Sequence, residues 1–198
     1  MLQASPGSVT GFVLAGGMSS RMGRDKAFVQ WQGESLLKRA LNVLRAVAAE
    51  VMIVGQRSKF LSYGPVVEDV FERRGPLAGI HAALAATATE LNLILAVDLP
   101  LMEPPFLKYL LHCAQATRAI VTLPRVAGRW QPLCAVYRKQ FGHRAREALK
   151  AGENRIDSLF SDSDVLSIAD EEIRGAGFSI DIFRNLNTPE DLREASQS

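Results

Sequence analysis

Short apolar runs alternate with amphipathic or small-residue segments through most of this 198-residue chain. Each apolar run has the length of one buried strand, and the segments between them have the spacing of helices. Strands are expected at 9–14, 51–54, 65–67, 91–97, 119–123 and 133–137, and helices at 35–48, 76–86, 105–114 and 141–149. This alternation predicts a three-layer α/β fold with a largely parallel sheet.

The rest of the composition is that of an ordinary globular protein. No linker, internal repeat or low-complexity segment divides the chain, so one domain over residues 1–198 is expected. A net charge of +2 is too small to indicate nucleic acid or a membrane as partner. No apolar run approaches the ~18 residues of a membrane span, and residues 9–15 are too short for a signal peptide core. The chain is therefore expected to be cytoplasmic, with Cys113 and Cys134 as reduced thiols.

The segment LAGGMSSRMGRDK at residues 14–26 follows the first expected strand. Gly16 and Gly17 allow a sharp turn whose backbone amides can bind an anion. Three cations follow within the segment, namely Arg21, Arg24 and Lys26. A surface turn with solvated cations is the alternative, but ligands of α/β sheets bind where strands end, so a triphosphate site is favoured. Neither the P-loop pattern nor the dinucleotide fingerprint is present.

Two acidic residues extend this hypothesis. Asp98 directly follows the apolar run 91–97, and one carboxylate with substrate phosphates and water is a usual set of ligands for Mg²⁺. An aspartate that begins a turn before Pro100 is the alternative. Asp69 precedes the glycine-containing segment 75–79 and could accept hydrogen bonds from a guanine ring, although an ordinary acidic turn before a helix explains it equally well.

Four blocks of the sequence resemble the molybdenum cofactor guanylyltransferases. Residues 14–26 are similar to the LAGGxSxRMGxDK signature of that family, which is the longest of the four. GPLAG at 75–79, DLP at 98–100 and NLNTPEDL at 185–192 follow in the family's order. Together the blocks span nearly the whole chain.

The resemblance implies a Rossmann-like nucleotidyltransferase fold and a specific reaction. The enzyme would transfer GMP from GTP to molybdopterin that carries molybdenum, release pyrophosphate and use Mg²⁺ as cofactor. GTP and molybdopterin are then its small-molecule partners, and proteins of cofactor biosynthesis or molybdoenzymes are expected protein partners. The glycine pair at 16–17, where related cytidylyltransferases usually have LAAG, favours guanine over cytosine.

The resemblance also assigns roles to individual positions. Arg21, Lys26 and Asp98 would act in catalysis, with Asp98 as the metal ligand. Asn185 and Asn187 would face the pterin. The expected nucleotide contacts are Leu14, Ala15, Gly16, Gly17, Lys26, Asp69, Gly75, Gly79 and Asp98.

Other activities stay open from the sequence alone. A related enzyme could use CTP, or an acceptor such as a sugar phosphate. A catalytically silent nucleotide-binding module would not need Asp98, and a nicotinamide oxidoreductase would need the missing glycine fingerprint. Residues 125–131 are predicted to form a loop over one edge of the site.

Overall fold

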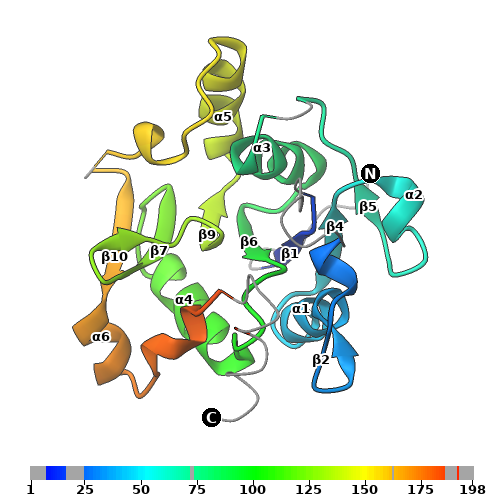
Figure 1. The fold of residues 1–198 in the computed structure, drawn as a ribbon. Helices are drawn as coiled ribbons and strands as arrows, with labels where there is room; N and C mark the ends of the chain where they lie inside the picture. The colour runs from blue at the N-terminus through cyan, green and yellow to red at the C-terminus, as the bar shows by residue number, and fades with distance from the viewer. Residues whose placement is uncertain (1–7, 17–24, 72–73, 162, 186–190, 192–198) are drawn as a thin grey trace.

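The computed structural model describes residues 8–16, 25–71, 74–161, 163–185 and 191. Its strands are β1 Val9–Leu14, β2 Gln30–Trp31, β3 Glu34–Ser35, β4 Glu50–Val54, β5 Val66–Val67, β6 Leu91–Ala96, β7 Val121–Val126, β8 Arg129–Trp130, β9 Cys134–Arg138 and β10 Val165–Ala169. Eight of them form one sheet in the order β10-β7-β9-β6-β1-β4-β5, with β8 paired to β7 (Figure 1). Strands β2 and β3 form a separate hairpin.

The sheet is largely parallel, as predicted. Strands β5, β4, β1 and β6 pair in parallel with one another, and β7 pairs in parallel with β10. The exception within this row is β9, which runs antiparallel to both β6 and β7. The predicted fold class is confirmed.

Helices cover both faces of the sheet and give the three layers (Figure 1). The helices are α1 Leu36–Arg45, α2 Arg57–Phe60, α3 Pro76–Ala86, α4 Pro104–Gln115, α5 Phe141–Lys150 and α6 Asp170–Gly175, with 3₁₀ turns η1 Lys26–Phe28, η2 Asp157–Leu159 and η3 Ile180–Phe183. Helix α1 begins where expected because the Ser35 hydroxyl accepts the Lys38 amide at 3.3 Å. No helix among these described residues is long and apolar enough to cross a membrane.

Two hydrophobic cores lie on the two faces of the sheet. The residues of β1 alternate between them, as a strand buried on both faces requires. Val9 and Val13 pack with α1 and α4, whereas Phe12 and Leu14 pack with α3 and α5. The covering helices therefore hold β1 from both sides, so the loop that leaves its carboxyl end starts from a rigid base.

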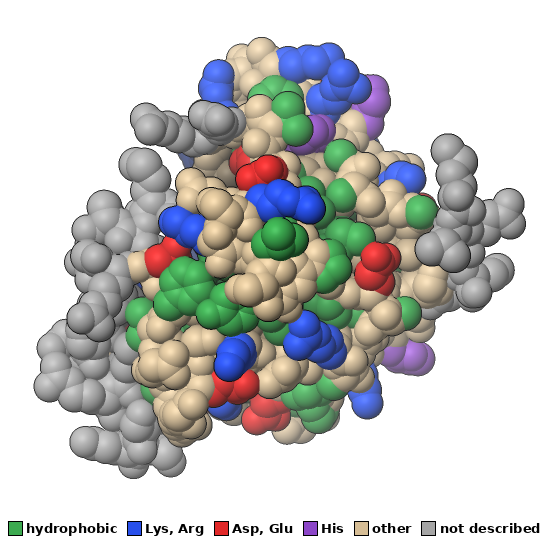
Figure 2. Space-filling model, turned by 90° about the vertical axis from the view of Figure 1, so that its right-hand side faces the viewer, with side chains coloured by type: hydrophobic (Ala, Val, Ile, Leu, Met, Phe, Trp, Pro, Cys, Tyr) green, Lys and Arg blue, Asp and Glu red, His purple; other side chains and the backbone are tan. Residues whose placement is uncertain are grey.

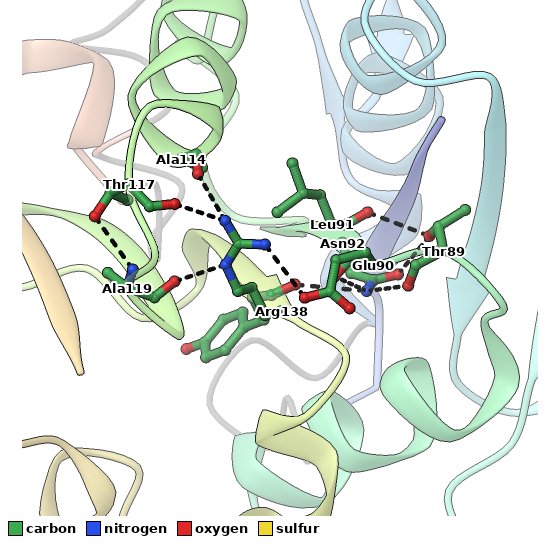
Figure 3. Close-up of polar contacts among 9 residues, drawn as sticks. Thr89, Glu90, Leu91, Asn92, Ala114, Thr117, Ala119 and Arg138 are labelled. Carbon is green, nitrogen blue, oxygen red and sulfur yellow. Dashed lines mark hydrogen bonds and ion pairs between the residues drawn. The ribbon is translucent and has the colours of Figure 1, made fainter. Parts of the chain in front are cut away.

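Polar contacts hold the end of the sheet at which β6 begins (Figure 3). The Arg138 guanidinium donates to three backbone carbonyls near the end of α4, those of Ala114, Thr117 and Ala119, at 2.7–3.3 Å. It also pairs with Glu90 at 3.2 Å. These contacts join β9, β6 and α4 at the edge away from the carboxyl end of β6.

One segment differs from the prediction made from the sequence, and another lies largely outside the described residues. The prediction of a loop at 125–131 is wrong, because β7 continues to Val126 and pairs with β8 in a hairpin. The two residues of its turn, Ala127 and Gly128, have φ angles of 48° and 75°, which suit a tight hairpin turn. The sequence also predicts a last helix that begins near Thr188 and Pro189, and apart from Asp191, which is helical, this segment lies outside the described residues.

Candidate active site

The candidate site lies where the chain reverses its direction of travel across the sheet. From β1 the chain proceeds outward to β4 and β5, and then returns to form β6 on the other side of β1. Leu14 and Ala96 are paired at the ends of β1 and β6, and the Val97 amide donates to the Leu14 carbonyl at 3.3 Å. The loops that follow these two strands therefore leave the sheet side by side, and ligands of open α/β sheets bind at such a point.

The structure brings Lys26 and Asp98 together at this point. The Lys26 Nζ lies 3.6 Å from the Asp98 Oδ2, and the two side chains are 22% and 25% exposed. Lys26 begins η1, where Ala27 is fully buried and its amide donates to Asp25 Oδ1 at 3.3 Å. A buried neighbour and a capped turn thus anchor Lys26 while its ammonium group stays accessible.

Asp98 fits the ligand set that Mg²⁺ requires. Its carboxylate is partly exposed and stands beside the Lys26 ammonium group. The described part of the chain contains no group of three or more His, Cys, Asp or Glu residues that could hold a metal alone. That arrangement suits a metal held by one carboxylate together with substrate phosphates and water, and it does not suit a metal enclosed entirely by protein ligands.

The other expected nucleotide contacts surround the ends of β1 and β5. Leu14 and Ala15 are buried, and Gly16 is exposed. A Cβ at Gly79 would lie 3.4 Å from a methyl carbon of Leu14, so α3 packs closely against the end of β1. Gly75 precedes α3 with φ 71°, a conformation that favours glycine, and it leaves the start of the helix open.

Asp69 lies just after β5, in a half-buried turn. Its Oδ1 accepts the Phe71 amide at 2.8 Å. The Phe71 ring meets the ring of His81 edge-on, with centroids 5.2 Å apart. The position of Asp69 is therefore tied to α3 through Phe71 and His81.

The expected pterin and phosphate contacts are only partly described. Asn185 is exposed and follows Phe183, whose ring packs on Phe106 of α4 at 5.1 Å. Helix α4 is the element that follows the Asp98 turn, so Asn185 belongs to the same side of the sheet as α4. Gly17, Arg21 and Asn187 lie outside the described residues.

Sequence reasoning missed Lys59. It comes from the short helix α2 and forms an ion pair with Asp25 Oδ2 at 2.9 Å. The pair places a second cation beside the residue that caps η1. A helix of four residues gives no periodic signal, and the partners are 34 positions apart, so no local pattern predicts this contact.

The described charges on one neighbouring face of the molecule do not form a single basic surface. On the face that carries α2 and β5, described lysines and arginines are interspersed with acidic and hydrophobic side chains (Figure 2). This agrees with the net charge of +2. A net charge this small gives little long-range attraction, so an anionic ligand depends on local groups such as Lys26.

A largely parallel sheet with a lysine–carboxylate pair at its switch point is typical of α/β proteins that bind nucleotides. Comparison with known proteins identifies the class more closely. The model of the MobA-like NTP transferase domain matches residues 11–166. The chain belongs to this family, and its assignment as a nucleotidyltransferase is confirmed.

Full-length relatives and solved structures agree with the family. A probable molybdenum cofactor guanylyltransferase of Pelotomaculum thermopropionicum is 36% identical and covers 98% of this chain and 93% of its own. Another probable molybdenum cofactor guanylyltransferase, from Natronomonas pharaonis, is 34% identical and covers 96% of this chain and 98% of its own. The crystal structure of molybdopterin-guanine dinucleotide biosynthesis protein A from Archaeoglobus fulgidus superposes with a TM-score of 0.82 at 25% identity, covering 95% of this chain and 97% of that one.

Proposed function

We propose that this enzyme transfers GMP from GTP to the terminal phosphate of molybdenum-loaded molybdopterin and releases pyrophosphate. The observation that carries the proposal is the 3.6 Å approach of Lys26 and Asp98 at the switch point. A triphosphate with its divalent cation needs a positive group for a phosphate and a carboxylate for the cation within one site. The names of the full-length relatives support guanine as the base and molybdopterin as the acceptor.

The proposed reaction requires little acid–base chemistry from the protein. The acceptor is a phosphate monoester, which is mostly dianionic near neutral pH because its second pKa is about 6. It can therefore attack the α-phosphorus of GTP without a general base. The protein must instead align the two phosphates and stabilise the charge that develops on the leaving pyrophosphate.

In this proposal each site residue has one task. The backbone of residues 14–16 and the ammonium of Lys26 hold the triphosphate. Asp69 and the start of α3 contact the nucleoside. Asp98 would hold Mg²⁺, which supplies charge neutralisation at the phosphates when it is bound. Arg21 and Gly17 complete the phosphate site, and Asn185 with Asn187 orients the pterin.

The test is pyrophosphate release with each nucleotide and each acceptor in turn. GTP with molybdenum-loaded molybdopterin and Mg²⁺ is expected to give turnover, and chelation of the metal with EDTA should abolish it. Release with CTP in place of GTP would reassign the base. Release with a sugar phosphate as acceptor, and none with molybdopterin, would overturn the proposal.

A further inference from the structure

Arg39 of α1 contacts both of the segments that carry Lys26 and Asp98. Its Nε donates a hydrogen bond to the Pro100 carbonyl. Its guanidinium carbon lies 4.4 Å from the centre of the Trp31 ring. Pro100 is two residues after Asp98, and Trp31 is five residues after Lys26, so one side chain bridges the two halves of the site.

The contact on the Asp98 side is made to a compact turn. The Met102 amide donates to the Leu99 carbonyl at 3.1 Å, and the side chains of Leu99 and Met102 are 5% and 3% exposed. Pro100 is buried as well. Because the turn is packed on both sides of Pro100, a hydrogen bond to that carbonyl also restrains Asp98, where the turn begins.

The contact on the Lys26 side is made to a short ordered run. The Val29 amide donates to the Lys26 carbonyl at 3.0 Å, and the Leu36 amide donates to the Val29 carbonyl at 3.0 Å. These bonds connect η1 to the β2–β3 hairpin, in which Trp31 is 4% exposed. The indole nitrogen is buried and has no hydrogen-bond partner among the described residues, so Trp31 serves here through the face of its ring.

Arginine is suited to this double contact. A guanidinium can stack on an aromatic face and at the same time donate a directed hydrogen bond from its edge, which an ammonium group does less well. We infer that Arg39 is a positioning residue that fixes the spacing between Lys26 and Asp98. The inference rests on the proposed function, in which the triphosphate and its metal bind across that spacing.

The test compares Arg39→Met with Arg45→Met. Arg45 lies on the same helix and also donates to one backbone carbonyl, that of Tyr63, at 3.2 Å, but this contact is not made to either segment of the site. Arg39→Met is expected to lower kcat/KM about tenfold, the order of loss that a small misplacement of reacting groups produces. It should also raise severalfold the Mg²⁺ concentration needed for half-maximal rate, and Arg39→Lys should recover part of both losses. Arg45→Met should change neither.

Two further measurements separate positioning from general stability. Amide hydrogen exchange of the free protein should be faster at Met102 in Arg39→Met and unchanged there in Arg45→Met. In the background of Asp98→Asn, Arg39→Met should lower kcat/KM little further, because a residue that acts through Asp98 loses its effect when that carboxylate is gone. Should Arg39→Met not fold, Arg39→Lys and Trp31→Leu replace it in both comparisons.

Equal effects of Arg39→Met and Arg45→Met on these measurements would overturn the inference. So would losses of kcat/KM from Arg39→Met and Asp98→Asn that multiply fully in the double variant. Failure of the proposed function looks different. In that case the wild-type protein gives no GMP transfer to molybdopterin, whereas the exchange rates at Met102 still decide whether Arg39 restrains the turn.

Discussion

At the scale of single residues, Lys26 and Asp98 satisfy each other's charge in the free protein. Both are partly exposed, so neither pays the full cost of burying a charge. Binding of a metal-bound triphosphate would replace this one contact with two, a phosphate on Lys26 and a cation on Asp98. The ion pair is therefore suited to hold both side chains in place until the ligand arrives.

Loss of either charge should slow the reaction and leave the fold intact. Lys26→Ala and Asp98→Ala are each expected to lower kcat by roughly 10²–10³, the effect of removing one preorganised charge contact. Steady-state pyrophosphate release measures this, with thermal melting as the check on folding. Lys38→Ala, at an exposed position of α1, is the control. Wild-type turnover in both site variants would remove Lys26 and Asp98 from the mechanism.

His81 gives a prediction about pH and stability. Burial lowers its pKa below the ordinary value of 6.5, Asp69 opposes this shift, and Arg146 adds to it. The unfolded chain therefore takes up a proton at higher pH than the folded one. The contribution of neutral His81 to stability is complete above pH 6.5 and declines as the pH falls from there towards the folded-state pKa.

Replacement of His81 should remove this part of the pH dependence. The free energy of unfolding of His81→Asn, measured with urea between pH 5 and 8, should fall less steeply on acidification than that of the wild type. His143→Asn, at an exposed position of α5, is the control. Parallel curves for the wild type and His81→Asn would show that the buried imidazole does not titrate in this range.

At the scale of elements, the Arg138 side chain connects β9 to the end of α4 by hydrogen bonds. One guanidinium satisfies three carbonyls that follow or end the helix, and it pairs with Glu90 beside β6. Hydrogen bonds from a charged donor contribute more than neutral ones, and loss of the donor leaves half-buried carbonyls without a partner.

Arg138→Met is therefore expected to lower the free energy of unfolding by about 2–3 kcal/mol. Urea denaturation measures the change, and Arg118→Met, at the exposed arginine between Thr117 and Ala119, is the comparison. The contacts of Arg138 lie at the far edge of the sheet, so kcat at a temperature where the variant is folded should not change. A loss of stability no greater than that of Arg118→Met would contradict the assignment.

The elements whose bounds were predicted well combine two sequence signals, a hydrophobic pattern and a residue that starts or ends the element. β1 matches its predicted bounds because an apolar run ends at glycines, and α3 matches because Pro76 starts a run of small apolar residues. β10 has only one buried residue among its five and gave no comparable signal. The direction of β9 depends on which strands lie beside it, which local pattern does not specify.

The same reasoning explains which parts of the site were predictable. Lys26 and Asp98 both follow strands, and the ends of parallel strands share one edge, so their proximity could be expected. Arg39 and Lys59 reach the site from helices through contacts with distant segments. Neither belongs to a motif, and only the folded arrangement shows their partners.

At the scale of the whole molecule, ligand binding should be visible as a rise in stability. A ligand that binds only the folded state adds about 2.7 kcal/mol when its concentration is 100 times its Kd. With Mg²⁺ present, GTP is expected to raise the melting temperature more than CTP, ATP or UTP. EDTA should reduce the GTP effect in the wild type and have little influence in Asp98→Ala. An equal rise with all four nucleotides would argue against selection of guanine.

The antiparallel strand β9 divides the sheet along a single seam. Residues 9–96 form the four strands on one side, β5, β4, β1 and β6, and residues 121–169 form those on the other. Within the sheet, one ladder between β6 and β9 joins the two portions, and the chain crosses between them through α4. Recombination within α4 would thus exchange an entire portion at one crossover, keeping the proposed nucleotide contacts at residues 14–98 and replacing the proposed pterin contacts Asn185 and Asn187.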